Sequence, residues 1–399
     1  MNPPVARLPA TVAVLHASAA RRALAGFSLS GFLAALPGAF LAAWGHHLDF
    51  EFRTVGHYFL ALTAGVLVSA EVTRRLLPRK RIGNALLLGC GLACAVLVYL
   101  GFVSPPMPAV WRIGGLLAMG FAAGLLNSAL FHAISPAYQQ DPPATVNLGG
   151  VFFGLGCLVV TLLAAGTFYA YSVGTILCFA ALLPGLFGVV YSRTDFSSTP
   201  IPAAVPLRRA WVDFKSPDAI LLALLLFFQF GNEWSIAGWL SVYLVGRLGV
   251  SPELALWALA FYWLMLLLGR VAAIAALPRI SHARLLAGSA GAAMFGCTIL
   301  LLTDNLFGAY TGLVLIGGGF APIYPLVAEK IGHRFTYYHP GLFNGIFSLA
   351  MIGAMLAPAT GGYLAAVWGT GMVMMLPLAG TVMVFALILL IWLESKLGG

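Results

Sequence analysis

The sequence predicts an all-α membrane protein with twelve transmembrane helices, arranged as two pseudo-symmetric six-helix bundles. Of its 399 residues, 61% are hydrophobic and only 8% are charged, whereas a soluble globular chain has about 25% charged residues. The apolar residues form twelve runs, and a polar stretch separates the first six from the last six. Short motifs also recur in the two sets of runs, which indicates an internal repeat.

Each apolar run is long enough to cross a bilayer, because about 20 residues of α-helix span the ~30 Å hydrocarbon core. In the first half of the chain the runs cover residues 23–44, 56–73, 83–103, 110–134, 145–166 and 170–191. In the second half they cover residues 218–245, 254–276, 284–303, 308–328, 342–366 and 371–393. We therefore expect an N-terminal bundle over 1–191, a linker over 192–217 and a C-terminal bundle over 218–399.

Basic residues mark one side of the membrane. If the N-terminus lies in the cytoplasm, seventeen of the 21 Lys and Arg residues fall in cytoplasmic segments, and Arg53, Arg112 and Arg247 fall outside. This bias follows the positive-inside rule, so we expect cytoplasmic N- and C-termini and a cytoplasmic linker. The net charge of +9 then reflects topology and does not indicate nucleic-acid binding. The excess of Arg over Lys and the abundance of Ala, Gly and Leu favour a bacterial inner membrane.

The polar residues argue against an enzyme. All five cysteines lie inside apolar runs, and those runs hold neither paired acids nor a set of His and acidic metal ligands. A sensor would usually carry a large soluble domain, for which the loops leave no room. We therefore expect no catalytic residue, no metal site and no cofactor, with H⁺ or Na⁺ as a possible coupling ion.

Two motifs recur in the two halves. The Leu-Pro-Arg sequence at 77–79, after the second run, returns at 277–279, after the eighth. Asn147 opens the fifth run and Asn344 opens the eleventh, each with a glycine nine residues later. A parallel repeat of six helices implies a binding site near the midplane of the membrane, between the two halves.

The most unusual stretch is the polar patch at residues 229–239, in the middle of the seventh run. Glu233 lies close to the centre of that run, where a carboxylate facing lipid would cost about 2.5–3.5 kcal/mol. We expect Glu233 to face a wet cavity or a partner. Gln229 lies one turn earlier on the same face, and Asn232 lies beside it. A hydrogen-bonded acid that braces the helix is the alternative to a functional Glu233.

The polar and aromatic residues of the spans suit a neutral polyol. Amides and carboxylates bind paired hydroxyl groups, and aromatic faces cover the C–H side of a sugar ring. The candidate substrate-binding residues are Asn127, Asn147, Gln229, Asn232, Glu233, Trp234, Trp263, Tyr324 and Asn344. An organic anion fits poorly, because no Lys or Arg lies at midspan, and a cation fits reasonably, with Glu233 as its counter-charge. The alternative to substrate binding is that the asparagines form hydrogen bonds between helices.

Several segments resemble the major facilitator superfamily. The basic segment Ser69–Arg81 resembles a degenerate form of that family's Gly-x-x-x-Asp-Arg-x-Gly-Arg-Arg motif. Four more segments resemble the fucose permease-like branch, the fucose–galactose–glucose–proton symporters and their relatives. These segments are 147–156, Gly231–Tyr243, Phe261–Arg270 and Gly317–Pro325. The resemblance implies the major facilitator fold and alternating access. It also implies gating by Glu71 with Arg74 and Arg75, to which we add Arg270 at the end of the eighth run.

The chain departs from the sugar–proton symporters at their coupling acids. Those proteins carry carboxylates in the first and fourth helices, whereas here the first run has no acid and the fourth has Asn127. If the protein couples to protons, the coupling residue is therefore Glu233. We expect a monomeric secondary transporter of a small polar solute, most simply a monosaccharide. Efflux of drugs or metabolites and uncoupled uniport are the alternatives.

Overall fold

The computed structural model describes residues 10–45, 51–76, 81–196, 216–335 and 345–397. The helices of the N-terminal half are α1 (Ala10–Gly45), α2 (Phe52–Leu76), α3 (Ile82–Phe102), α4 (Ala109–Ala133), α5 (Ser135–Gln140), α6 (Pro142–Thr167), α7 (Val173–Ala180) and α8 (Leu182–Ser192). Those of the C-terminal half are α10 (Pro217–Leu248), α11 (Pro252–Ala276), α12 (His282–Leu302), α13 (Leu306–Phe320), α14 (Ile323–Arg334), α15 (Gly345–Trp368) and α16 (Met372–Leu397).

The described chain has twelve segments that are long and apolar enough to cross a membrane, which confirms the predicted number of spans. Ten of these spans lie within a single helix, whereas α7 with α8 and α13 with α14 form the other two. The tenth span breaks at Pro322, because proline has no backbone N–H to continue the hydrogen-bond ladder. The chain turns sharply after α10 at Gly249, whose positive φ of 63° favours glycine.

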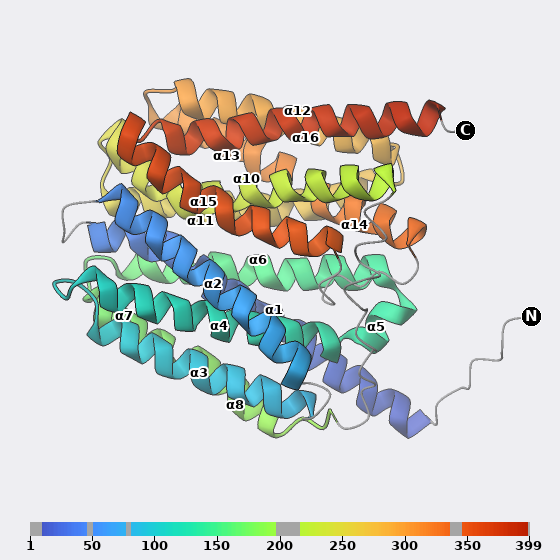
Figure 1. Ribbon diagram of the computed structural model, residues 1–399, viewed down its shortest axis with the longest axis horizontal. Coiled ribbons are helices and arrows are strands. Elements are labelled where there is room, and N and C mark those ends of the chain that lie inside the picture. The colour runs from blue at the N-terminus through green and yellow to red at the C-terminus, as the bar shows by residue number, and fades with distance from the viewer. Residues whose placement is uncertain (1–9, 46–50, 77–80, 197–215, 336–344, 398–399) are drawn as a thin grey trace, which may run out of the picture.

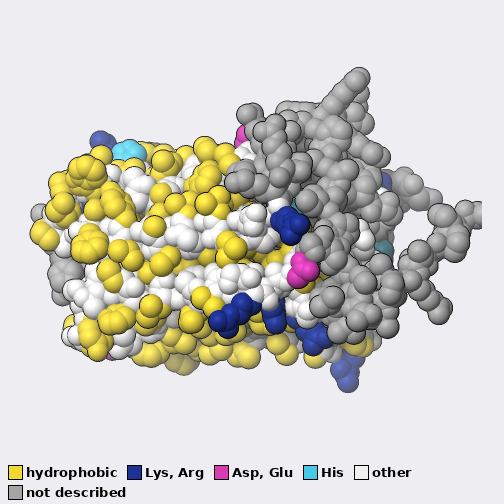
Figure 2. Space-filling view, turned by 90° about the horizontal axis from the view of Figure 1, so that it is seen from below, with side chains coloured by type: hydrophobic (Ala, Val, Ile, Leu, Met, Phe, Trp, Pro, Cys, Tyr) yellow, Lys and Arg dark blue, Asp and Glu magenta, His cyan; other side chains and the backbone are white. Residues whose placement is uncertain are grey.

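The helices form two bundles that lie side by side (Figure 1). Helices α1 to α8 make the lower bundle of the view and α10 to α16 the upper one, and the start of α1 and the end of α16 lie at the same end. The bundles meet mainly where α15 packs on α2, α11 on α6 and α10 on α1. We call the end where α2 finishes and α6 and α10 begin the linker end, and the opposite end the far end. Figure 2 shows Lys and Arg gathered toward the linker end, beside a broad hydrophobic surface.

At the far end the two halves are in backbone contact. Gly38 of α1 lies so close to the carbonyl of Ala237 on α10 that a Cβ atom there would overlap the oxygen. The fully buried Trp239 packs its ring on Phe59 of α2 and donates an Nε1 hydrogen bond to the carbonyl of Pro358, at 2.8 Å. These contacts bring the two halves together at the far end.

Candidate functional site

Two adjoining cavities lie between the halves. The central cavity has a volume of about 160 Å³, and the far-end cavity has a volume of about 90 Å³. Both are lined by Val66, Gly124, Asn127, Phe153, Trp234 and Met351. Sites that hold small organic ligands usually measure ~300–1,000 Å³. Both cavities are therefore smaller than a typical ligand site, and their walls come from both halves.

Glu233 lies near the middle of α10 and lines the central cavity, as the sequence leads one to expect. Its Oε1 accepts a hydrogen bond of 2.8 Å from Nε2 of Gln229, one turn earlier on the same helix. Gln229 is fully buried, so it holds the carboxyl group in one orientation. The hydroxyl of Tyr262 donates a 3.3 Å hydrogen bond to the backbone carbonyl of Glu233. Gln229 thus orients the carboxyl group of Glu233, which still lines the cavity.

Arg270 lines the same cavity, although it lies near the end of α11. The sequence has no Lys or Arg at midspan, and Arg270 does lie near the end of its span, but its side chain nevertheless lines the central cavity. Its backbone is near the linker end, but side chains on an α-helix lean toward the helix N-terminus. In α11 that direction leads from the linker end back to the midplane. The guanidinium donates a hydrogen bond to the carbonyl of Gly150 on α6, across the two halves.

Aromatic rings form much of the remaining wall. Trp234 stacks edge-on against Trp263 and against Phe153, with both pairs of ring centroids 6.1 Å apart. Tyr324, at the start of α14, lies edge-on to Phe230 at 5.1 Å. Trp234, Trp263 and Tyr324 thus take the cavity positions expected from the sequence. Such rings present flat apolar surfaces to a ligand, as the C–H face of a sugar requires.

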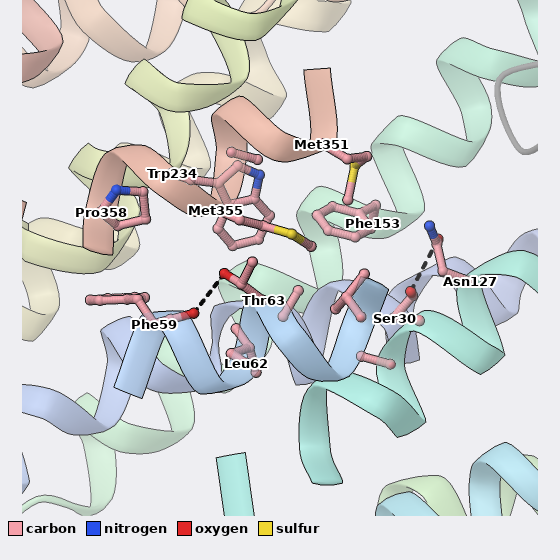
Figure 3. A pocket seen from close by; sticks show the side chains of 15 residues that line it. Ser30, Phe59, Leu62, Thr63, Asn127, Phe153, Trp234, Met351, Met355 and Pro358 are labelled. Atoms are coloured by element: carbon pink, nitrogen blue, oxygen red, sulfur yellow. Dashed lines mark hydrogen bonds between the residues drawn. The ribbon is translucent and has the colours of Figure 1, made fainter. Parts of the chain in front are cut away.

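The N-terminal half contributes an uncharged polar group from Asn127. Figure 3 shows Asn127 on α4 with its Oδ1 accepting a hydrogen bond of 3.2 Å from the hydroxyl of Ser30 on α1. Thr63 of α2 lies in the same wall and bonds back to the Phe59 carbonyl, at 2.7 Å. Asn127 therefore occupies the expected wall and has its amide nitrogen available for other contacts.

Other candidate binding residues lie elsewhere. Asn232 is almost fully buried and faces Gly380 of α16, away from both cavities. Asn147 is half-buried near the start of α6 and is not among the residues that line either cavity. Asn344 lies outside the described residues. The structure therefore places neither Asn232 nor Asn147 at a cavity, and a binding role for Asn344 stays a prediction.

Among the described side chains of the candidate gating residues, Arg270 is the one with a hydrogen bond between the two halves, to Gly150. Glu71 is half-buried near the end of α2. The side chains of Arg74 and Arg75 lie outside the described residues. Gating by the Glu71 group stays a prediction.

The sequence alone did not indicate the phenylalanines and small hydroxyl residues of the cavity walls. Ser30, Thr63 and Phe153 line the far-end cavity, and Phe27 and Ser128 line the central one. Phenylalanine is common throughout the apolar runs, and Ser and Thr often bond only to their own helix. Neither residue type signals which face of a span meets a cavity, so no feature of the single sequence would have singled them out.

The fold matches solved transporter structures. No protein-family model matches the sequence, and no curated protein matches it. A crystal structure of a variant of the E. coli fucose–proton symporter FucP superimposes with a TM-score of 0.67 at 14% identity, covering 94% of this chain and 99% of that one. A structure of the major facilitator superfamily transporter FucP in the outward conformation gives 0.65 at 15% identity, covering 92% and 98%. The protein therefore has the major facilitator fold.

Proposed function

We propose that the protein is a secondary transporter that moves a small polar solute, a sugar or related polyol, across the membrane by alternating access. The observation that carries the proposal is the central cavity, whose wall comes from both halves of a major facilitator fold. A cavity between two bundles can open to either side as the bundles rock. One copy of the chain lines the cavity, which supports a transporter that works as a monomer.

The lining supports a polyol as the solute. Asn127 and Glu233 offer hydrogen-bonding groups from opposite halves, while Trp234 and Trp263 offer flat apolar faces. The printed name of the FucP structure, a fucose–proton symporter, adds support for a sugar. Catalysis is not proposed, because both matched structures are of transporters.

Proton coupling is assigned to Glu233. It is the acidic residue of the described cavity lining, and burial disfavours the charged form of a carboxyl group. A carboxyl group at the cavity wall can take up a proton from one side and release it to the other as access alternates. Gln229 would hold the group in place in both forms.

The orientation follows from charge. Basic residues concentrate at the linker end (Figure 2), so that end and both termini face the cytoplasm under the positive-inside rule. The membrane would be the inner membrane of a bacterium. The far end would then face outward.

The test is uptake into proteoliposomes. A labelled monosaccharide panel is offered with and without an imposed pH or Na⁺ gradient, to the native protein and to Glu233→Gln. We expect proton-driven accumulation by the native protein. The variant should lose accumulation but keep exchange of solute for solute. Glu329→Gln is the matched control, because Glu329 lies on α14 next to His282 and His333 and outside the cavities.

Other outcomes would redirect the proposal. Equilibration that ignores both gradients and the substitution would indicate a uniporter with a structural Glu233. Absence of uptake for every sugar would contradict the solute class and favour efflux of drugs or metabolites.

A further inference from the structure

The central cavity contains a cationic group whose charge the surrounding protein does not pair. Arg270 is only 8% exposed. Its guanidinium donates to the carbonyl of Gly150, which is a neutral acceptor. Its Nε is buried and has no hydrogen-bond partner. Within the described chain Arg270 makes no ion pair with a carboxylate. A buried charge in this condition is unfavourable unless another group compensates it.

The carboxyl group of Glu233 offsets the positive charge of Arg270 only from a distance, without a direct hydrogen bond. The two side chains interact electrostatically, but the carboxyl group of Glu233 is bonded to Gln229 on its own helix. The other titratable groups within electrostatic reach of Arg270 are Cys157 on α6, Tyr262 on α11 and Tyr324 on α14. Thiols and phenols are ordinarily neutral near pH 7. The net charge of the cavity is therefore set by Arg270 and by the protonation of Glu233.

Glycines on the opposite wall make room for the guanidinium. A Cβ atom at Gly150 would come within 2.8 Å of Nη1 of Arg270, and one at Gly154 within 3.8 Å of the same atom. Larger residues at Gly150 would push the guanidinium away from the α6 wall. Trp263, on the same helix as Arg270 and 4% exposed, also has a buried Nε1 without a partner. The wall around Arg270 thus holds two donors that the protein leaves unused.

We propose that Arg270 binds a carboxylate group of the solute, so that the transported solute is a sugar acid or similar polyhydroxylated carboxylic acid. A guanidinium is the side chain best suited to a carboxylate, because its parallel N–H groups match the two oxygens. The hydroxyl groups of the same molecule would meet Asn127, and its ring or chain would lie against Trp234 and Trp263. The inference rests on the proposed transport function and narrows its solute.

The charges also predict how the acid and a proton move together. With Glu233 ionised, the cavity is neutral overall and its carboxylate repels an anion. With Glu233 protonated, the positive charge of Arg270 is left for the solute. The anion and the proton should therefore bind cooperatively and cross as an electrically neutral pair.

The test compares matched pairs of labelled solutes in proteoliposomes: galactose with galacturonate, and glucose with glucuronate. We expect the native protein to accumulate an acid under an inward proton gradient and to prefer it to its neutral partner by about tenfold or more. Arg270→Gln should abolish that preference. Arg270→Lys, which keeps the charge but not the paired N–H groups, should transport the acid with a higher KM. Arg279→Gln is the control, because Arg279 is exposed and contacts only the Ala275 carbonyl among the described residues.

The outcomes separate this inference from the proposed function. Accumulation of the neutral sugars without the acids would overturn the role of Arg270 and leave the sugar transporter standing. Equal uptake of the acid by native protein and Arg270→Gln, with both proteins melting at the same temperature, would also overturn it. If the native protein transports none of the four solutes, both proposals are contradicted.

Discussion

The two halves share a scaffold but contribute different chemistry to the central cavity. The N-terminal half lines it with uncharged groups such as Asn127 and Ser128, beside phenylalanines and glycines. The C-terminal half supplies Glu233 and Arg270, the charged members of the described lining, together with the two tryptophans. Under the proposed function, the C-terminal half responds to the proton and the N-terminal half helps to bind the solute. Coupling requires that both walls touch the same solute.

A substitution at Gly150 should have the largest effect, because the carbonyl of Gly150 accepts the hydrogen bond from Arg270 that joins the two walls. Gly150→Ala would place a Cβ atom 2.8 Å from Nη1 of Arg270, so the guanidinium must shift and its bond to the Gly150 carbonyl is weakened. Hydrogen bonds to charged groups contribute about 1.5–3 kcal/mol. We expect the initial rate of uptake to fall about tenfold or more. Gly166→Ala, on the same helix and outside both cavities, is the control, since its Cβ atom would meet nothing within 4 Å. Equal rates for the two variants would show that the link is dispensable.

Asn127 tests the uncharged wall alone. Asn127→Ala removes one amide from the cavity and leaves Glu233 untouched, and a single hydrogen bond contributes about 0.5–1.5 kcal/mol. We expect KM to rise about two- to tenfold while the accumulation ratio at saturating solute is unchanged. Uptake kinetics under a fixed pH gradient would measure both quantities. Loss of accumulation with a native KM would instead place coupling in the N-terminal half.

Asn232 should have the smallest effect, although it is next to Glu233 in sequence. Its side chain faces Gly380 on α16 and does not line a cavity. The amide nitrogen of Asn232 is buried without a hydrogen-bond partner, so Asn232→Ala should change the melting temperature little. KM and accumulation should stay native. A raised KM would bring Asn232 back into the binding site.

The fold was predictable because the bilayer constrains it so strongly. Spans must be apolar and about 20 residues long, so the hydropathy pattern alone yields their number and rough limits. Glu233 was predictable for a related reason, since lipid excludes a carboxylate at midspan. The apolar run over 170–191 gives no sign of a break, whereas the span is built from α7 and α8.

The details of the site depend on the directions in which individual side chains point, and the hydropathy pattern does not contain this information. Asn232 and Glu233 are adjacent and equally polar, yet only one lines the cavity. Their directions differ by about 100° around the helix, and only the packing of α16 decides which is covered. Arg270 was assigned to the end of its span because its position along the helix was considered without the lean of its side chain. Contacts such as that with Gly150 join residues far apart in sequence, and a single sequence gives no signal for them.

The most direct test of the central claim is proton movement on addition of solute. Proteoliposomes with no imposed gradient are placed in weakly buffered medium, and the external pH is recorded when a transported solute is added. The account predicts that inward flow of solute carries protons with it and makes the medium alkaline for the native protein, and that Glu233→Gln abolishes this signal while solute still exchanges. Equal alkalinisation by both proteins would contradict the claim that the charged wall of the C-terminal half carries the proton through Glu233.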